Sequence, residues 1–336
     1  MLNKKKNKGP YFMNKKDIPQ IDDFIQFLSN DILKTPIISI YQFKRGASSF
    51  NYLVTLKDKK LLVKLAWKHK KEGVERLVKI IKTLAQNNIP TANVISFQNN
   101  SIFSYKNSYG FVLEYIDGKS LPACKVQKKH LYEILNMYKS FQKISFEDEK
   151  ILIPAYDFKI LQEEYLKNCN IMLEKTTPFS LSNFLLKMCQ KELQKIGESP
   201  LKIEEKQKNI IHGDFHHNNI LFKENKLQSF LDFEDVGYGY ATEDLLRFAL
   251  CLTARQHLFY PSKKSLINCI DILTTEFSYS YEKWMVGLNS FTLQKMKKVF
   301  VKPRTPSIDL TKKLIQLIVF MRKYHFVKSI LKKKIL

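Results

Sequence analysis

Apolar residues follow two different periods along the chain. Upstream, short runs rich in β-branched and aromatic residues predict strands at 37–43, 50–56 and 60–67. Downstream, apolar residues recur every three or four positions with few Gly or Pro between them, which predicts helices. These helices are expected at 131–141, 158–173, 181–196, 243–253, 264–277 and 310–330. The pattern indicates an α+β protein in which strands come first and helices follow.

One helix is expected inside the strand-rich part. Its apolar stripe consists of Val74, Leu77, Val78, Ile81, Leu84 and Ala85 and ends before the Asn-Asn-Ile-Pro turn at 87–90. On the strand before it, alternation places Lys64 on one face with Leu62 and Ala66. A lysine flanked by apolar residues indicates an anionic partner, with extension to solvent at a sheet edge as the alternative.

The run from 212 to 235, HGDFHHNNILFKENKLQSFLDFED, has an order of polar residues that suits phosphoryl transfer. Moving the γ-phosphoryl group of ATP requires a carboxylate for the attacking hydroxyl and oxygen ligands for magnesium. Asp214 is the candidate base, and Asn219 and Asp232 offer hard oxygen ligands. The polar turn at 223–226 separates two short strands, the second expected at 227–233, and this hairpin would bring both ligands to one end.

This region resembles the aminoglycoside phosphotransferase and choline kinase superfamily. The resemblance rests on H-G-D-x-x-x-x-N, on the hydrophobic-Asp-aromatic-Glu segment, and on a Gly-x-x-x-x-Asp-Leu segment at Gly239, Asp244 and Leu245. It implies a protein-kinase-like two-lobed fold, with a small β-rich N-lobe containing one main helix and a larger, mostly helical C-lobe. The implied domains are a partly helical N-terminal extension at 1–35, a nucleotide-binding N-lobe at 36–117 and a catalytic, substrate-binding C-lobe at 118–336.

The resemblance also implies roles for this run. Asp214 becomes the catalytic base, Asn219 and Asp232 become the magnesium ligands, and His212 becomes a scaffold for the loop. ATP and Mg²⁺ are the implied cofactors. His-Gly-Asp alone could occur by chance in a loop, and Asp232 alone could be a turn residue. The joint pattern favours the family.

For the nucleotide phosphates, the resemblance points to residues upstream. Gly46 and Ser48 lie in the KRGASS turn, which could cover phosphates with its backbone N–H groups or be an ordinary hairpin turn. Lys64 is assigned to the α- and β-phosphates. Glu75 is the chosen partner of this lysine, although Glu72 or no partner at all are alternatives.

The strand and hinge at 109–121 would complete the nucleotide site. There the extended backbone of Glu114, Tyr115 and Ile116 is expected to offer hydrogen-bonding groups to the adenine edge, and Gly118 lets the chain turn into the larger lobe. A generic strand followed by a turn is the alternative.

Composition agrees with two modest cores: the chain has 336 residues, 44% of them hydrophobic. Five irregularly spaced cysteines indicate a reducing compartment. The longest apolar run near the end is too short to cross a bilayer, and no signal-peptide stretch follows Lys4–Lys6. A cytoplasmic protein is therefore expected.

The net charge of +24 is the other large feature. A lysine-rich proteome explains most of it, but residues 311–336 hold eight Lys or Arg and no acid among apolar residues. Such a stretch could rest on the anionic inner face of a membrane or bind a phosphorylated substrate. A packed final helix with a solvated basic tail is favoured, and no nucleic acid partner is expected.

Charge also ranks the acceptors. A polycationic aminoglycoside calls for an acidic pocket, and choline calls for an aromatic cage, for which Tyr238, Tyr240 and Trp284 are available. A sugar, a glycan such as lipopolysaccharide core, or an amino alcohol is preferred as acceptor. His216 and His217 are interpreted as loop residues, with His216 near substrate, because no His or Cys stands nearby at zinc-ligand spacing.

Two further classes remain as alternatives. A protein kinase is disfavoured because DFED is followed at once by VGYG and a helix, which leaves no room for a long activation segment. A nucleotide-binding pseudokinase is the other class, since the glycine turn holds one glycine and the glutamate partner of Lys64 is ambiguous. The intact Asp214, Asn219 and Asp232 argue against it.

Overall fold

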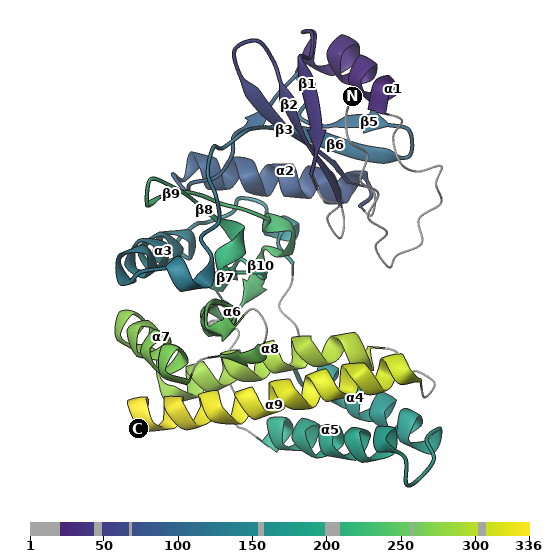
Figure 1. Cartoon of the computed structure of the whole chain (residues 1–336), viewed down its shortest axis with the longest axis vertical. Coiled ribbons are helices and arrows are strands. Elements are labelled where there is room, and N and C mark those ends of the chain that lie inside the picture. Colours follow the sequence, from purple (N-terminus) through teal and green to yellow (C-terminus); the bar gives the residue numbers. More distant parts are fainter. Residues whose placement is uncertain are drawn as a thin grey trace. The chain divides into compact units, whose positions relative to one another are not determined.

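A computed structural model describes residues 21–43, 49–66, 69–153, 158–198, 209–255, 258–261, 263–301 and 307–336. The chain forms two compact units. Unit 1 comprises residues up to Lys82 together with Ala92–Ile116, and unit 2 comprises Thr83–Thr91 and Asp117–Leu336. An antiparallel sheet with one main helix is followed by a mostly helical part, which confirms the predicted α+β class (Figure 1). The functional domain limits of the sequence analysis stay predictions.

Unit 1 is built on an antiparallel sheet with the strand order β1-β2-β3-β6-β4, to which β5 adds beside β6 (Figure 1). The strands are β1 (Ser39–Gln42), β2 (Ser49–Thr55), β3 (Lys60–Ala66), β4 (Val94–Ile95), β5 (Phe103–Tyr105) and β6 (Ser108–Glu114). The three predicted upstream strands fall on β1, β2 and β3, and Trp67 lies outside the described residues. In the middle of the sheet, Lys64 stands opposite Asn51 on β2 and Phe111 on β6.

The main helix of this region is α2 (Lys71–Gln86). Its predicted stripe is on the inner face, since Val74, Leu77, Val78, Ile81 and Leu84 are buried. The helix ends because Asn88 adopts a left-handed conformation with φ of 59°. The N–H of Ile89 then donates to the carbonyl of Leu84 at 3.0 Å, which closes a Schellman-type cap before Pro90.

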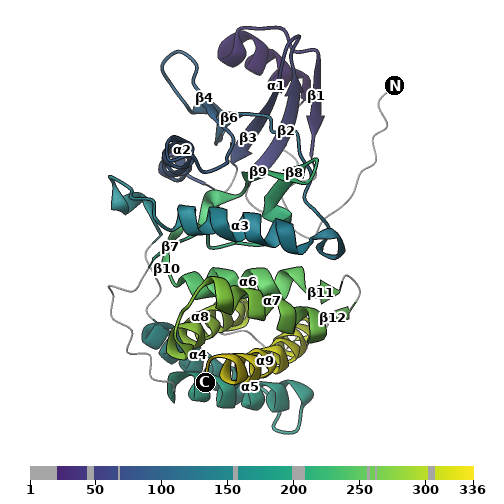
Figure 2. The same ribbon diagram turned by 90° about the vertical axis from the view of Figure 1, so that its left-hand side faces the viewer.

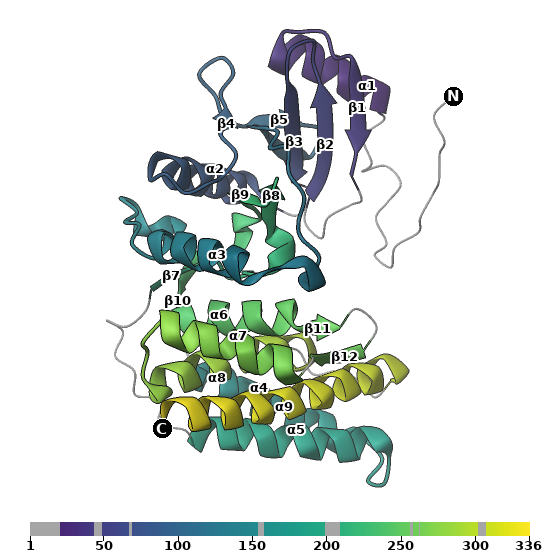
Figure 3. The same cartoon turned by 60° about the vertical axis from the view of Figure 1, so that its left-hand side comes forward.

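Unit 2 is mostly helical. Its helices are α3 (Lys128–Phe141), α4 (Phe158–Glu174), α5 (Leu181–Glu198), α6 (Ala241–Leu252), α7 (Lys263–Glu276), α8 (Tyr281–Phe300) and α9 (Ile308–Ile335). Figures 2 and 3 show α4, α5, α8 and α9 side by side, with α9 packed against α5 and α8. The sequence pattern did not predict α8. Its residues 284–293 are all buried, so the helix lacks the polar face that makes a helical period visible.

Short strands and turns connect these helices. The strands are β7 (Asn209–Ile211), β8 (Ile220–Lys223), β9 (Lys226–Phe230), β10 (Gly237–Gly239), β11 (Ala254–Arg255) and β12 (Leu258–Pro261), paired as β7–β10, β8–β9 and β11–β12. Single 3-10 turns are η3 (Ala123–Lys125), η4 (Glu149–Ile151), η6 (His217–Asn219) and η7 (Phe233–Asp235). The second strand of the predicted hairpin ends at Phe230, earlier than expected, because Asp232 turns left-handed with φ of 64°.

The basic C-terminal stretch forms most of α9. One side of this helix is buried, through Leu310, Leu314, Leu317, Met321, Tyr324, Val327, Ile330 and Leu331. This agrees with a packed final helix, and Lys332, Lys333 and Lys334 at its end are exposed. Among the described residues, no helix is long and apolar enough to cross a membrane. Contact of the basic residues with an anionic membrane surface stays a prediction.

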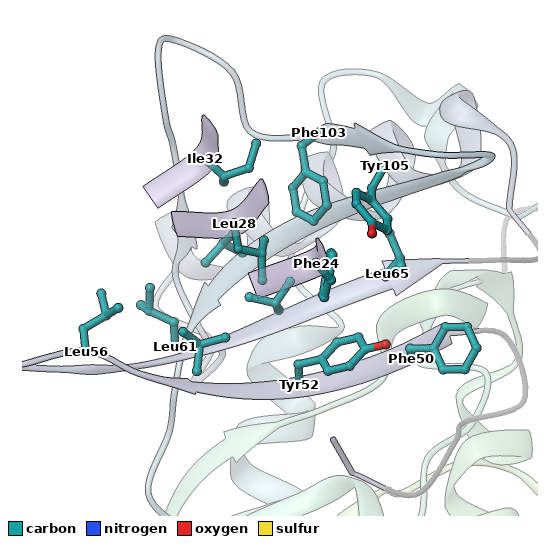
Figure 4. Packing of buried hydrophobic residues seen from close by; sticks show 13 residues of the cluster. Phe24, Leu28, Ile32, Phe50, Tyr52, Leu56, Leu61, Leu65, Phe103 and Tyr105 are labelled. Atoms are coloured by element: carbon teal, nitrogen blue, oxygen red, sulfur yellow. The ribbon is translucent and has the colours of Figure 1, made fainter. Parts of the chain in front are cut away.

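An N-terminal helical segment completes the core of unit 1. Helix α1 (Ile21–Phe27) continues as a π-helical turn, η2 (Leu28–Leu33). Figure 4 shows Phe24, Leu28 and Ile32 of this segment in one cluster with side chains of β2, β3 and β5. The Phe24 ring lies 5.0 Å from that of Tyr52 and 4.8 Å from that of Tyr105, measured between centroids. The segment therefore supplies aromatic packing that the sheet does not provide alone.

Candidate active site

A buried carboxylate fixes the loop that begins at His212. Asp244, at the start of α6, is fully buried. Its Oδ2 accepts from the N–H of His212 at 2.6 Å and from the Tyr138 hydroxyl at 3.0 Å, and its Oδ1 accepts from the N–H of Gly213 at 3.1 Å. Because both oxygens are occupied by short bonds, the loop is held by the backbone of the residues just before Asp214.

The His212 side chain joins this loop to the β8–β9 hairpin. Its Nε2 lies 2.8 Å from the carbonyl of Leu231, and the N–H of Asp214 donates to its Nδ1 at 3.4 Å. The two ring nitrogens therefore contact two different segments of the chain. The role of His212 as a scaffold for this loop stays a prediction, and these contacts are its support.

Gly213 permits a close approach that no other residue allows. Its φ is 79°, and a Cβ placed there would lie 2.3 Å from the carbonyl oxygen of Asp235. The loop and the η7 turn therefore touch through backbone alone. Gly213 is the glycine of the His-Gly-Asp motif, but its close approach to Asp235 could not be predicted from the sequence.

Asp214 is surrounded by hydrogen-bond donors. Its Oδ2 lies 3.2 Å from Nε2 of His216, and its Oδ1 lies 3.5 Å from Nη1 of Arg247. Burial alone would raise the pKa of Asp214, but the hydrogen bond and charge of His216, with the charges of Arg247 and His212, outweigh it and lower the pKa to about 2. Asp214 is therefore ionised at neutral pH.

Asn219 and Asp232 lie at one end of the hairpin. Ile220 pairs with Phe230, and the N–H of Leu231 donates to the carbonyl of Asn219 at 2.8 Å. The Asn219 amide nitrogen donates to the Asp214 carbonyl at 3.0 Å, so its amide oxygen faces away from that partner. The backbone pairing thus brings Asn219 and Asp232 to the same end of the hairpin, and an amide oxygen and a carboxylate are donor types that suit a hard divalent cation.

Asp235 adds a further carboxylate near this end of the hairpin. Burial, followed by the negative charges of Asp214 and Asp232, raises the pKa of its side chain. The negative charge of neighbouring carboxylates favours a cation beside Asp235. The donor types suit a magnesium ion, but within the described ranges no group of three or more His, Cys, Asp or Glu side chains is arranged to hold a metal. Asp235 was not among the sequence-predicted site residues.

A charged network behind Asp214 was also missed. Arg247 Nη2 donates to Glu243 Oε1 at 3.3 Å and to Gln294 Oε1 at 2.6 Å, and the Ser290 hydroxyl donates to Glu243 Oε2. Burial raises the pKa of Glu243 to about 7, against the opposing effects of Arg247 and Ser290. An acid and a base four residues apart, in a helix that is mostly apolar after its first turn, were the available signal in the sequence.

A cavity of about 210 Å³ opens beside this network. It is lined by Ile153, Phe158, Ile211, Gly213, Asp235, Gly237, Tyr238, Gly239, Tyr240, Glu243, Arg247, Ser290, Gln294 and Lys297. Tyr238 and Tyr240, two of the aromatic residues considered for a choline cage, are present. Trp284 is fully buried in α8 and does not line the cavity.

The nucleotide-side residues belong to unit 1. Lys64 is half-buried on β3, and Glu75 forms an exposed ion pair with Lys71 on the same helix at 3.6 Å. Glu75 as the partner of Lys64 therefore stays a prediction. Gly46 and Ser48 lie outside the described residues.

In the predicted hinge, two backbone N–H groups already donate hydrogen bonds within unit 1. The N–H of Glu114 donates to the carbonyl of Asn93 at 2.9 Å, and that of Tyr115 donates to the carbonyl of Lys60 at 3.2 Å. Because these two N–H groups have partners, the adenine contacts expected from the hinge are limited to the carbonyl oxygens of Glu114 and Tyr115 and to the backbone of Ile116.

Comparison with known proteins identifies the family. The model of the phosphotransferase enzyme family (APH) matches residues 39–260 of the 336-residue chain, which is more than half of it. The chain belongs to the phosphotransferase enzyme family. It is accordingly an ATP-dependent kinase of small molecules with an alcohol group as acceptor. No curated protein sequence matches it significantly.

Solved structures of similar phosphotransferases share the kinase-like fold. Spectinomycin phosphotransferase APH(9)-Ia, in complex with ADP and spectinomycin, has a TM-score of 0.64 at 12% identity over 93% of this chain and 96% of its own. Amicoumacin kinase hAmiN, in complex with AMP-PNP, Ca²⁺ and Ami, has a TM-score of 0.60 at 16% identity over 94% and 96%. Ethanolamine kinase from Plasmodium vivax has a TM-score of 0.58 at 15% identity over 93% and 92%.

Proposed function

We propose that this phosphotransferase uses ATP and Mg²⁺ to phosphorylate a hydroxyl group of a sugar, a glycan such as lipopolysaccharide core, or an amino alcohol. The supporting observation is the environment of Asp214. Its carboxylate is ionised, the loop that carries it is fixed by Asp244, and Asn219, the proposed metal ligand, donates to its carbonyl. A carboxylate held in this way can accept a hydrogen bond from a hydroxyl and direct the oxygen at the phosphorus.

The low pKa of Asp214 defines its part in the reaction. A carboxylate with a pKa of about 2 is a weak base toward a free alcohol. It therefore orients the hydroxyl first and receives the proton as the oxygen–phosphorus bond forms and the hydroxyl becomes acidic. His216, 3.2 Å from Asp214 Oδ2, keeps that oxygen in place during this step.

Asn219 and Asp232 would hold magnesium through their amide and carboxylate oxygens. The ion would supply positive charge to the β- and γ-phosphates. In the same proposal, Lys64 pairs with the α- and β-phosphates, Gly46 and Ser48 cover them, and Glu114 and Ile116 contact adenine through their backbone. Their chemistry suits these tasks, since phosphate recognition uses ammonium and backbone N–H groups.

A kinase of amines bearing a hydroxyl group, such as choline, ethanolamine or an aminoglycoside, is the second candidate. The observation in its favour is the wall of the cavity, where Tyr238, Tyr240 and Phe158 stand with Asp235. Aromatic faces and a carboxylate together stabilise organic cations. We place the protein in the cytoplasm, because all five cysteines are thiols without disulfide partners.

The decisive test is an acceptor panel with ATP and Mg²⁺, read by ADP formation and by mass spectrometry of the products. The panel contains sugars, choline, ethanolamine, homoserine and aminoglycosides. We expect one class to give a product heavier by one phosphoryl group. Replacement Asp214→Asn should lower kcat by about 10²-fold or more with little change in KM for ATP.

Asp309→Asn is the matched control, since the Asp309 side chain is exposed on α9 and its ion pair with Lys313 is a surface pair, which contributes little to stability. Equal turnover in Asp214→Asn and the wild type would refute the catalytic assignment. ATP binding with no acceptor-dependent ADP in the wild type would instead support a pseudokinase.

A further inference from the structure

Exposed apolar side chains gather at one end of the helices of unit 2. The turn between α4 and α5 carries Phe179, which is fully exposed, and the first turn of α5 adds Leu181 and Phe184, the latter 60% exposed. In α9, Ile308 is 78% exposed, and the exposed Ile315 follows it two turns later. Apolar side chains that face water together mark a surface that interacts with another body.

Two contacts join the segments that carry these side chains. The hydroxyl oxygens of Ser182 on α5 and Thr311 on α9 lie 2.7 Å apart in a hydrogen bond. Further along, His325 Nε2 lies 2.8 Å from Glu192 Oε2, so the two helices run side by side in the same direction. Figures 1 and 3 show the α4–α5 turn and the start of α9 at the same end of these helices. We call the surface formed there the apolar end patch, and it consists of Phe179, Leu181, Phe184, Ile308 and Ile315.

Helix α9 has two faces of different character. Its inner face is the buried side that packs on the other helices of unit 2. On α5, the exposed face continues from Phe184 through Lys187 and Lys191, three and seven residues further on. The outer face of α9 likewise repeats at intervals of three and four residues, and its exposed or half-buried members are Ile308, Lys312, Ile315, Val319, Arg322 and Phe326. Cationic side chains therefore stand among the apolar ones on both helices.

The charge of these segments is strongly positive. Residues 174–195 contain four Lys and two acids, Glu174 and Glu192. Residues 307–336 contain eight Lys or Arg and one acid, Asp309. Glu192 and Asp309 each form an ion pair with a lysine of their own helix, which reduces their negative field. The apolar end patch therefore has a basic surround.

This charge distinguishes between the bodies that could cover the patch. A second copy of the chain would bring the same basic surround, and a net charge of +24, against its own, which is repulsive. A bilayer with anionic headgroups offers the complementary charge, and beneath the headgroups it offers an apolar layer for exposed Phe and Leu side chains. Both the apolar and the basic side chains of this surface are then matched.

We propose that the apolar end patch docks on an anionic lipid bilayer. Phe179, Leu181 and Phe184 enter the boundary between headgroups and acyl chains, and the exposed Lys312 and Arg322 contact the headgroups. Phe and Leu on one side with Lys and Arg beside them are the composition of segments that lie in a membrane interface. The proposal does not depend on the kinase reaction, because the patch and the cavity are formed by different residues.

The first experiment measures binding of the full chain to vesicles by co-sedimentation. Vesicles of phosphatidylcholine alone are compared with vesicles that contain about 30% phosphatidylglycerol, and we expect the anionic vesicles to bind at least about tenfold more tightly. Phe179→Ser and Phe184→Ser should each weaken that binding about tenfold, because each removes one inserted ring. Lys312→Gln and Arg322→Gln should each weaken it about fivefold.

Matched controls come from unit 1. Ile38→Ser removes an apolar side chain that is 67% exposed on the segment before β1, and Lys59→Gln removes an exposed charge between β2 and β3. We expect both to bind anionic vesicles like the wild type. All the substituted side chains are exposed, so the variants should keep the circular dichroism of the wild type.

The second experiment detects insertion itself. Phe179→Trp places a fluorophore in the apolar end patch, and Tyr41→Trp places one on β1, where the tyrosine is also exposed. With the wild-type signal subtracted, we expect anionic vesicles to shift the emission of Phe179→Trp to shorter wavelength, and brominated lipid to quench it. Tyr41→Trp should show neither effect.

Three results would overturn the proposal. One is binding to anionic vesicles that is the same in Phe179→Ser, Phe184→Ser and the wild type, since this is adsorption of a basic protein by charge alone. Another is an equal response of Phe179→Trp and Tyr41→Trp. The third is a dimer in analytical ultracentrifugation that Phe184→Ser dissociates, since this assigns the patch to a second copy of the chain. ATP turnover enters none of these measurements.

Discussion

Asp244→Asn is the sharpest test of how the catalytic loop is held. The carboxylate accepts three hydrogen bonds, from the N–H groups of His212 and Gly213 and from the Tyr138 hydroxyl. An asparagine keeps one acceptor oxygen. Its best orientation puts that oxygen in the place of Oδ2, where two bonds survive, and turns the amide nitrogen toward the N–H of Gly213.

The expected loss of stability follows from that geometry. One charge-assisted hydrogen bond, about 1.5–3 kcal/mol, disappears, and the Gly213 N–H faces another donor, which costs about 1–3 kcal/mol. Part of this is offset because burial raises the pKa of Asp244, so removing the charge relieves some desolvation. We expect a net destabilisation of about 3 kcal/mol. The loop should also loosen, which lowers kcat more than it raises KM for ATP.

Urea unfolding monitored by circular dichroism, together with ADP formation, would measure both effects. Asp309→Asn makes the same chemical change at a side chain that is 68% exposed, and we expect it to alter stability by less than about 0.5 kcal/mol. If Asp244→Asn proves as stable as this control, Asp244 does not hold the loop and the reasoning is wrong.

Three more predictions concern the same unit. Gly213→Ala should destabilise by about 2–4 kcal/mol, because the new Cβ meets the Asp235 carbonyl at 2.3 Å at a φ of 79°. Gly73→Ala in α2, where the new Cβ makes only ordinary contact with the His69 side chain at 3.4 Å, should be neutral or slightly stabilising in the same urea assay. The pKa of Glu243 is raised on folding to about 7, so its contribution to stability is complete below pH 4.5 and is lost as pH rises through about 7. Between pH 4.5 and pH 8, the free energy of unfolding of Glu243→Gln should therefore rise relative to that of the wild type by up to about 3 kcal/mol. A difference between the two proteins that is the same at both pH values would contradict this. Chelation by EDTA should abolish ATP turnover and Mg²⁺ should restore it, with more Mg²⁺ needed by Asp232→Asn; turnover that survives EDTA would remove magnesium from the mechanism.

The sequence predicted what depends on local pattern. The alternation along β3, the stripe of α2 and the amphipathic helices of unit 2 could be recognised because each has one solvent-facing side. The order of Asp214, Asn219 and Asp232 was informative because phosphoryl transfer uses a carboxylate and oxygen ligands for magnesium, although the roles of these residues stay predictions. Helix α8 was missed because its middle is buried all round.

Other features depend on contacts between distant segments. Arg247 reaches Asp214 from 33 positions away in the chain, and Gln294 is a further 47 positions on. Nothing local distinguishes Gln294 from any other helical glutamine. The left-handed turn at Asp232, which ends β9 early, also went unrecognised, since aspartate favours that conformation only weakly.

The helical segment at residues 21–33 has a practical consequence for anyone who shortens the protein. The family match begins at residue 39, yet Phe24, Leu28 and Ile32 lie in the middle of an aromatic core. A truncated protein that begins at residue 39 would expose Tyr52, Phe103 and Tyr105 to water as an apolar surface patch. Such a product should be recovered mainly as aggregates, and expression vectors for this protein should keep everything from Ile21 onward.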